Sequence, residues 1–237
     1  MKKLTKRTTF IVNAILVLIV FGVYAFSFIP EKIVPISGAD SVQAIYNGNR
    51  QNPNVSLMFN VYENTNIVNG ILDELKIKGV KATFFVGGCW ADDNGETLVR
   101  IVQEGHEIGN HGYFHKDHKK LDKQSNQDEI RLTGEIVEAL CGVKPTLFAP
   151  PSGSFSATTL EVATELNYKV IMWSKDTIDW RDNDVNIIYN RATKNLENGD
   201  FILMHPKAHT LKALPKIIEY YKSVGFSVVT VSESLLI

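Results

Sequence analysis

The chain has 237 residues, which is enough for one full-sized domain and a short additional region. Its 25 Lys and Arg residues nearly balance its 26 Asp and Glu residues, so the formal net charge is -1. This balance excludes the strong basic excess that is typical of nucleic-acid-binding domains, and we expect no nucleic-acid partner. A neutral polymer is compatible with this charge as a substrate or ligand.

The N-terminal segment predicts a membrane anchor. Basic residues precede an uncharged, mostly apolar stretch at 8–29, which at about 22 residues is long enough to cross a bilayer as a helix. Phe26 and Phe28 end this stretch, where a cleavable signal peptide would have small residues. We therefore expect a cytoplasmic tail at 1–7 and an uncleaved signal-anchor at 8–29. The positive-inside rule then places the rest of a single-pass cell-membrane protein outside the cytoplasm.

Positions 30–53 predict a linker because Pro, Gly and Asn recur there. Positions 54–237 predict one α/β domain, in which apolar strand candidates alternate with amphipathic helix candidates. The expected strands lie at 55–61, 82–86, 107–109, 146–148, 169–173, 201–204 and 227–231.

Apolar residues spaced three and four apart predict helices at 66–78, 128–140, 158–166 and 211–223. Gly79 provides a stop for the first helix, and Thr158 with Glu161 forms a candidate capping box for the third. Seven strands in so short a span predict a small, incomplete (β/α)7 barrel of the TIM type. Functional residues of such barrels lie at the C-terminal ends of the strands.

Four short motifs fall at these expected strand ends. They are Leu-Met-Phe-Asn-Val at 57–61, His-Gly-Tyr-Phe-His at 111–115, Phe-Ala-Pro-Pro-Ser-Gly at 148–153 and Leu-Met-His at 203–205. His111 and His115 are four residues apart, a spacing that lets both imidazoles face one divalent ion at about 2.0–2.1 Å.

In their order and composition, the four motifs resemble those of the polysaccharide deacetylase family, also described as the NodB homology domain or carbohydrate esterase family 4. Enzymes of that family remove acetyl groups from N-acetylated sugars. The resemblance implies hydrolysis of a carbon–nitrogen bond that is not a peptide bond, on a cell-wall glycan such as peptidoglycan or on another N-acetylated polysaccharide. It also implies a divalent metal ion, zinc or similar, held by His111 and His115.

The resemblance assigns further roles at the site. His205 matches the family's catalytic acid, and the backbone N–H of Ser152 matches its oxyanion donor. The expected sugar-binding residues are Trp180 and Leu203, which match the family's acetyl pocket, and the aromatic residues Tyr113 and Trp173 near expected strand ends.

Three family residues are absent from this chain. Asn60 and Val61 stand where the family has the Asp-Asp of its first motif, the general base and a metal ligand. Ala149 stands where the family has the arginine that tethers the base. Losing a general base costs roughly 10²–10⁴ in rate, although Glu63 or Asp176 could replace a missing carboxylate. Two hypotheses follow: a metal-dependent de-N-acetylase whose metal is weakly bound, and a non-catalytic protein of the same fold that binds carbohydrate or acts as an envelope scaffold.

Overall fold

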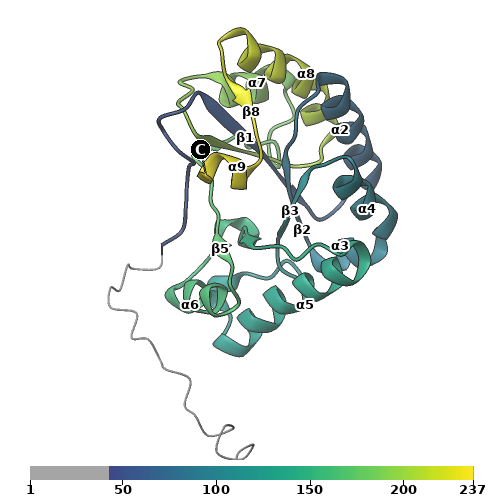
Figure 1. Cartoon of the computed structure of the whole chain (residues 1–237), viewed down its shortest axis with the longest axis vertical. Helices are drawn as coiled ribbons and strands as arrows, with labels where there is room; N and C mark the ends of the chain where they lie inside the picture. Colours follow the sequence, from purple (N-terminus) through teal and green to yellow (C-terminus); the bar gives the residue numbers. More distant parts are fainter. Residues whose placement is uncertain (1–42, 237) are drawn as a thin grey trace, which may run out of the picture. The chain divides into compact units, whose positions relative to one another are not determined.

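The computed structural model describes residues 43–236 (Figure 1). They form an open barrel around an eight-stranded sheet whose order is β5-β4-β3-β2-β1-β7-β6, with β8 also pairing with β1. Every pairing between these strands is parallel. The strands are β1 (Asn54–Val61), β2 (Thr83–Val86), β3 (Glu107–Asn110), β4 (Leu147–Phe148), β5 (Lys169–Val170), β6 (Lys175–Asp176), β7 (Asp200–Met204) and β8 (Ser227–Val228).

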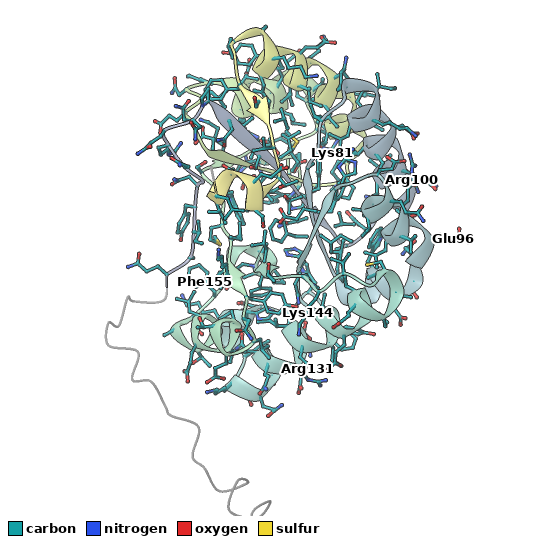
Figure 2. All side chains as sticks on the ribbon, in the orientation of Figure 1. Lys81, Glu96, Arg100, Arg131, Lys144 and Phe155 are labelled. Atoms are coloured by element: carbon teal, nitrogen blue, oxygen red, sulfur yellow. The ribbon has the colours of Figure 1, made fainter. Side chains whose placement is uncertain are left out.

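The helices cover the outside of this sheet, and their charged side chains, such as Arg100 and Arg131, lie toward solvent (Figure 2). Gly79 ends α2 in the left-handed conformation (φ 61°), which confirms the predicted glycine stop. The helices are α2 (Thr65–Lys78), α3 (Gly88–Asp93), α4 (Gly95–Gln103), α5 (Lys123–Cys141), α6 (Ala157–Glu165), α7 (Val185–Thr193), α8 (Ala208–Ser223) and α9 (Val231–Leu236), with short 3-10 helices η1 (His118–Lys120) and η2 (Pro151–Gly153).

The central strand β1 is buried along its whole length, and the alternation of its side chains separates two layers. Leu57, Phe59 and Val61 pack in a large apolar cluster with the buried faces of α2 and α8. Met58 belongs to a smaller apolar cluster of the other layer. Asn60 lies two residues after Met58, so their side chains are on the same face of the strand. The strand therefore places the Asn60 and Val61 side chains in different layers.

Several predicted elements differ from the observed ones. The predicted incomplete barrel of alternating strands and helices is confirmed, but the expected count of seven strands is wrong, because β6 was not predicted. A two-residue strand is too short to leave a periodic pattern in the sequence. The capping box of α6 is formed by Ser156 and Thr159 rather than by Thr158 and Glu161, because the helix begins at Ala157 and Thr158 already lies inside it.

Residues 43–53, predicted as part of a linker, contact the sheet. The Ile45 N–H donates to the Val170 carbonyl at 2.8 Å, and the Met172 N–H donates to the Ile45 carbonyl at 2.7 Å. Asn47 forms a bridge with Asp200, whose carboxylate also accepts a hydrogen bond from Arg50 at 2.8 Å. The domain boundary therefore lies before residue 54.

The predicted tail (1–7) and signal-anchor (8–29) lie outside the described residues. Within residues 43–236, the helices are all too short or too polar to cross a membrane.

A chain that begins at Gln51 is expected to be less stable than one that begins at Gln43. It loses the two backbone hydrogen bonds and the apolar contacts of Ile45, which together contribute about 2–3 kcal/mol. The melting temperature should fall by about 5–10 °C. Thermal unfolding followed by circular dichroism checks this expectation, and equal melting temperatures would show that residues 43–50 do not stabilise the domain.

Candidate functional site

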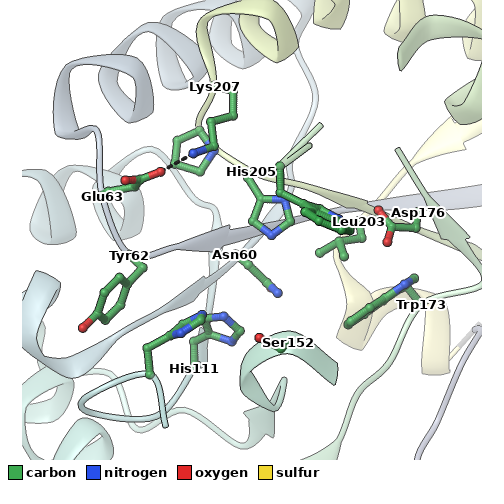
Figure 3. Close-up of a pocket in the computed structure, with 13 residues that line it drawn as sticks. Asn60, Tyr62, Glu63, His111, Ser152, Trp173, Asp176, Leu203, His205 and Lys207 are labelled. Atoms are coloured by element: carbon green, nitrogen blue, oxygen red, sulfur yellow. Dashed lines mark hydrogen bonds and ion pairs between the residues drawn. The ribbon is translucent and has the colours of Figure 1, made fainter. Parts of the chain in front are cut away.

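A cavity of about 430 Å3 lies where β1 and β7 end (Figure 3). It contains every residue that the sequence predicted for the site except Tyr113. The residues that line it are Asn60, Tyr62, Glu63, His111, His115, Ser152, Trp173, Asp176, Trp180, Leu203, His205, Pro206 and Lys207.

Tyr113 lies outside this cavity. Gly112, in the left-handed conformation (φ 72°), turns the chain between His111 and Tyr113. The Tyr113 ring then packs beside Phe114, with 4.7 Å between the ring centroids, and against the backbone of Gly88 at the start of α3. The structure therefore does not place Tyr113 where it could stack on a ligand in the cavity.

The two histidines of the second motif do meet at the cavity wall. Their ring centroids lie 5.1 Å apart. His111 Nδ1 donates to the Ala149 carbonyl at 2.7 Å, which leaves Nε2 available. Burial lowers the pKa of His111 to about 3, and burial also lowers the pKa of His115. Both imidazoles are therefore neutral at pH 7, the form that ligates metals.

The described residues fit only part of a divalent-metal centre. Zinc sites of enzymes use three protein ligands, but no third His, Cys, Asp or Glu joins His111 and His115 within residues 43–236. Val61 is fully buried in the large apolar cluster and has no donor atom. The remaining donor set does not complete a catalytic metal site.

Asn60 occupies the position of the family's general base, and it is 4% exposed. Its Oδ1 atom has no hydrogen-bond partner among the described residues. A neutral amide cannot accept the proton of an attacking water. Ala149 is fully buried with Met58 in the smaller apolar cluster, so apolar atoms surround the position where the family has its tethering arginine.

The two candidate substitute carboxylates lie on the cavity wall, and each has another partner. Glu63 forms an ion pair with Lys207, which reaches it from the loop after β7 (Figure 3). Asp176 accepts a hydrogen bond at 2.7 Å from the N–H of Ile178 in its own turn. Neither carboxylate is bound to a group that would direct it at an attacking water.

His205 is held by a buried carboxylate that was not predicted from the sequence. Asp179 is 1% exposed and accepts hydrogen bonds from Nδ1 of His205 at 2.7 Å and from the His205 backbone N–H at 2.7 Å. Thr210 donates a third bond to it at 2.6 Å. Asp179 thereby fixes the ring orientation and the tautomer of His205, which leaves Nε2 to act in the cavity.

The sequence offered little signal for Asp179. It follows Asp176 closely and precedes Trp180, and nothing in the local pattern distinguishes a buried carboxylate from a solvated one. The pairing of β6 with β7 brings this segment beside His205, a long-range contact that local spacing does not predict. Tyr62, Pro206 and Lys207 were also missed, although Tyr62 and Pro206 are adjacent in sequence to predicted residues and Lys207 lies two residues after His205.

Comparisons with known proteins identify the family of this chain. The family model for polysaccharide deacetylase matches residues 47–171. The protein YlxY of Bacillus subtilis, which is uncharacterized, is 38% identical over 205 residues, covering 86% of this chain and 64% of YlxY. A peptidoglycan-N-acetylglucosamine deacetylase of Bacillus cereus is 35% identical over 201 residues, covering 83% of this chain and 73% of that enzyme. The chain thus spans somewhat less than two thirds of the length of YlxY.

Among solved structures, BA3943 of Bacillus anthracis, a CE4 family pseudoenzyme, matches with a TM-score of 0.80 and 35% identity. The match covers 82% of this chain and 69% of BA3943. A BA3943 mutant with restored enzymatic activity matches with the same TM-score. Since the family model covers more than half of the chain and the relatives exceed 30% identity, the chain belongs to the polysaccharide deacetylase family.

Proposed function

We propose that the cavity takes an N-acetylated sugar of a cell-wall glycan of the peptidoglycan type, and that its reaction is hydrolysis of the N-acetyl group. The observation that carries this proposal is the buried pairing of Asp179 with His205 beside the turn of Ser152. Leu203, which is 2% exposed, supplies an apolar wall for the acetyl methyl group. The relatives that act on peptidoglycan support the same class of substrate.

Each retained group has a definable task. His205 Nε2 protonates the departing amine while Asp179 stabilises the resulting imidazolium. The backbone N–H of Ser152, in a left-handed turn (φ 56°), donates to the developing oxyanion. Trp173 and Trp180 offer flat apolar faces to sugar rings. Since no described side chain acts as base and the metal centre is incomplete, the attacking water is poorly activated and turnover is slow.

A second candidate is a non-catalytic protein that binds the same glycan. Asn60, Val61 and Ala149 favour it, since each removes part of the water-activating machinery. The match to the BA3943 pseudoenzyme favours it as well. Either candidate suits a single-pass membrane protein whose domain lies outside the cytoplasm, as the apolar segment at 8–29 suggests.

Acetate release from N-acetylglucosamine tetramers and from peptidoglycan separates these candidates. Wild-type protein should release acetate slowly, and His205→Ala should reduce the rate by roughly 10²-fold or more. Equal rates for both proteins would place any hydrolysis outside this cavity. Measurable glycan binding without acetate release from either protein would establish the non-catalytic candidate.

A further inference from the structure

Tyr62 is an aromatic residue at the rim of the cavity that has no task in the proposed reaction. It directly follows β1 and lies two residues after Asn60, so the alternation of the strand directs it to the layer of the cavity, which it lines. Tyr62 is also 41% exposed, although most large apolar side chains of the domain are buried. An exposed aromatic ring at the edge of a cavity is typical of a contact with a ligand.

The ring of Tyr62 is held in place by its neighbours. Its centroid lies 4.8 Å from that of His115, and the His115 ring is in turn 5.1 Å from that of His111. The ring also lies close to the backbone of Gly87, where a Cβ atom would be only 2.7 Å from Cδ2 of Tyr62. Because the ring is fixed before a ligand arrives, little side-chain entropy is lost when a ligand stacks on it.

Aromatic side chains border the cavity on its opposite side as well. Trp173 lies across the cavity from Tyr62 (Figure 3). Trp180, which is 56% exposed, follows β6 and also lines the cavity. Beside Tyr62, the ion pair of Glu63 and Lys207 supplies polar atoms at the rim that can bind sugar hydroxyl groups (Figure 3). Both sides of the cavity therefore offer surfaces to a chain that extends beyond it.

We propose that Tyr62 forms a further sugar-binding position, which stacks on the sugar adjacent to the one inside the cavity. With the tryptophans on the other side, the site binds an interior segment of at least three sugars rather than the end of a glycan chain. The flat face of a pyranose ring carries C–H groups, which an aromatic face covers well. The inference rests on the proposed function, in that the cavity must take a glycan, but it holds whether or not the glycan is hydrolysed.

The test measures the affinity of the full chain for N-acetylglucosamine dimers and tetramers by titration calorimetry. Wild-type protein should bind the tetramer at least roughly fivefold more tightly than the dimer, because only the tetramer fills the cavity and both of its sides. Tyr62→Ala should weaken tetramer binding by roughly fivefold or more. Dimer binding should fall less, because a dimer can occupy the cavity and the tryptophan side. Tyr62→Phe keeps the ring and should stay within about twofold of wild type.

The matched control is Tyr46→Ala, which removes a similarly exposed tyrosine (47%) outside the cavity lining and should leave both affinities unchanged. Unchanged tetramer binding by Tyr62→Ala would show that Tyr62 only supports His115, and would overturn the further sugar-binding position while leaving a glycan-binding cavity. Equal losses in Tyr62→Phe and Tyr62→Ala would overturn stacking, because the hydroxyl would then carry the contact. Absence of wild-type binding to either oligomer would instead overturn the proposed function.

Discussion

The double variant Asn60→Asp, Val61→Asp is expected to release acetate from N-acetylglucosamine tetramers at least 10²-fold faster than wild type in the presence of zinc, roughly the contribution of one general base. The first change supplies an acceptor for the proton of the attacking water. The second supplies the carboxylate that the family uses beside His111 and His115. Steady-state rates measured over a range of zinc concentrations check this expectation.

Thermal unfolding provides a second measurement for the same change. Val61 is fully buried in the large apolar cluster, so a carboxylate there should destabilise the zinc-free protein. If the new carboxylate turns to the histidines, zinc at about 100 times its dissociation constant should restore about 2.7 kcal/mol. Val61→Asn is the matched control, because asparagine has nearly the shape of aspartate but no charge. The melting temperature of this variant should respond much less to zinc.

A melting temperature of Val61→Asp that does not respond to zinc would show that position 61 faces the core whatever residue stands there. Wild-type turnover as fast as that of active deacetylases would contradict the expectation that the wild-type site lacks a general base. In that case, loss of activity in Glu63→Gln or in Asp176→Asn would identify the base. Adding Ala149→Arg should not raise the rate further, because Ala149 is fully buried in the smaller apolar cluster, where an arginine would be overpacked.

Asp179→Ala is expected to lower the free energy of unfolding by about 3 kcal/mol and the melting temperature by about 6–12 °C. The change leaves three donors without their acceptor: the backbone N–H and Nδ1 of His205 and the hydroxyl of Thr210. It should also abolish acetate release, because nothing then orients His205. Thermal unfolding and the acetate assay measure the two effects.

Asp182→Ala is the matched control for this prediction. Asp182 pairs with Arg181 and Arg191 near the surface, where ion pairs contribute little. Its loss should change the melting temperature far less and leave acetate release unchanged. Similar melting temperatures for the two variants would mean that the hydrogen bonds of Asp179 do not hold this part of the domain together.

The sequence predicted the barrel and most of its site because both depend on patterns that are local in the chain. β1 is a mostly apolar run, and α2 ends before a glycine, so both were predicted nearly to the residue. His111, Ser152 and His205 were found through motifs at strand ends. Four helices were not predicted: α3, α4, α7 and α9. Each has only six to nine residues, which is too short to show a clear helical period.

What the sequence could not predict depends on contacts between distant segments. Asp179 acts through a residue 26 positions away, and Glu63 is neutralised by a lysine 144 positions away. Tyr113 was expected in the cavity because its motif lies there, but the turn at Gly112 directs its ring to α3. These outcomes are decided by tertiary packing rather than by local propensity.

The pairing of Ile45 with the strand segment around Val170 also bears on how the protein behaves in concentrated solution. β5 is the last strand on one side of the sheet, and Ile45 occupies hydrogen-bonding groups there that would otherwise be free. Free groups on a terminal strand are templates for pairing with another chain, which leads to aggregation. A chain that begins between residues 46 and 54 would therefore expose the hydrogen-bonding groups of this edge strand. The shortened protein should self-associate at temperatures below its melting temperature.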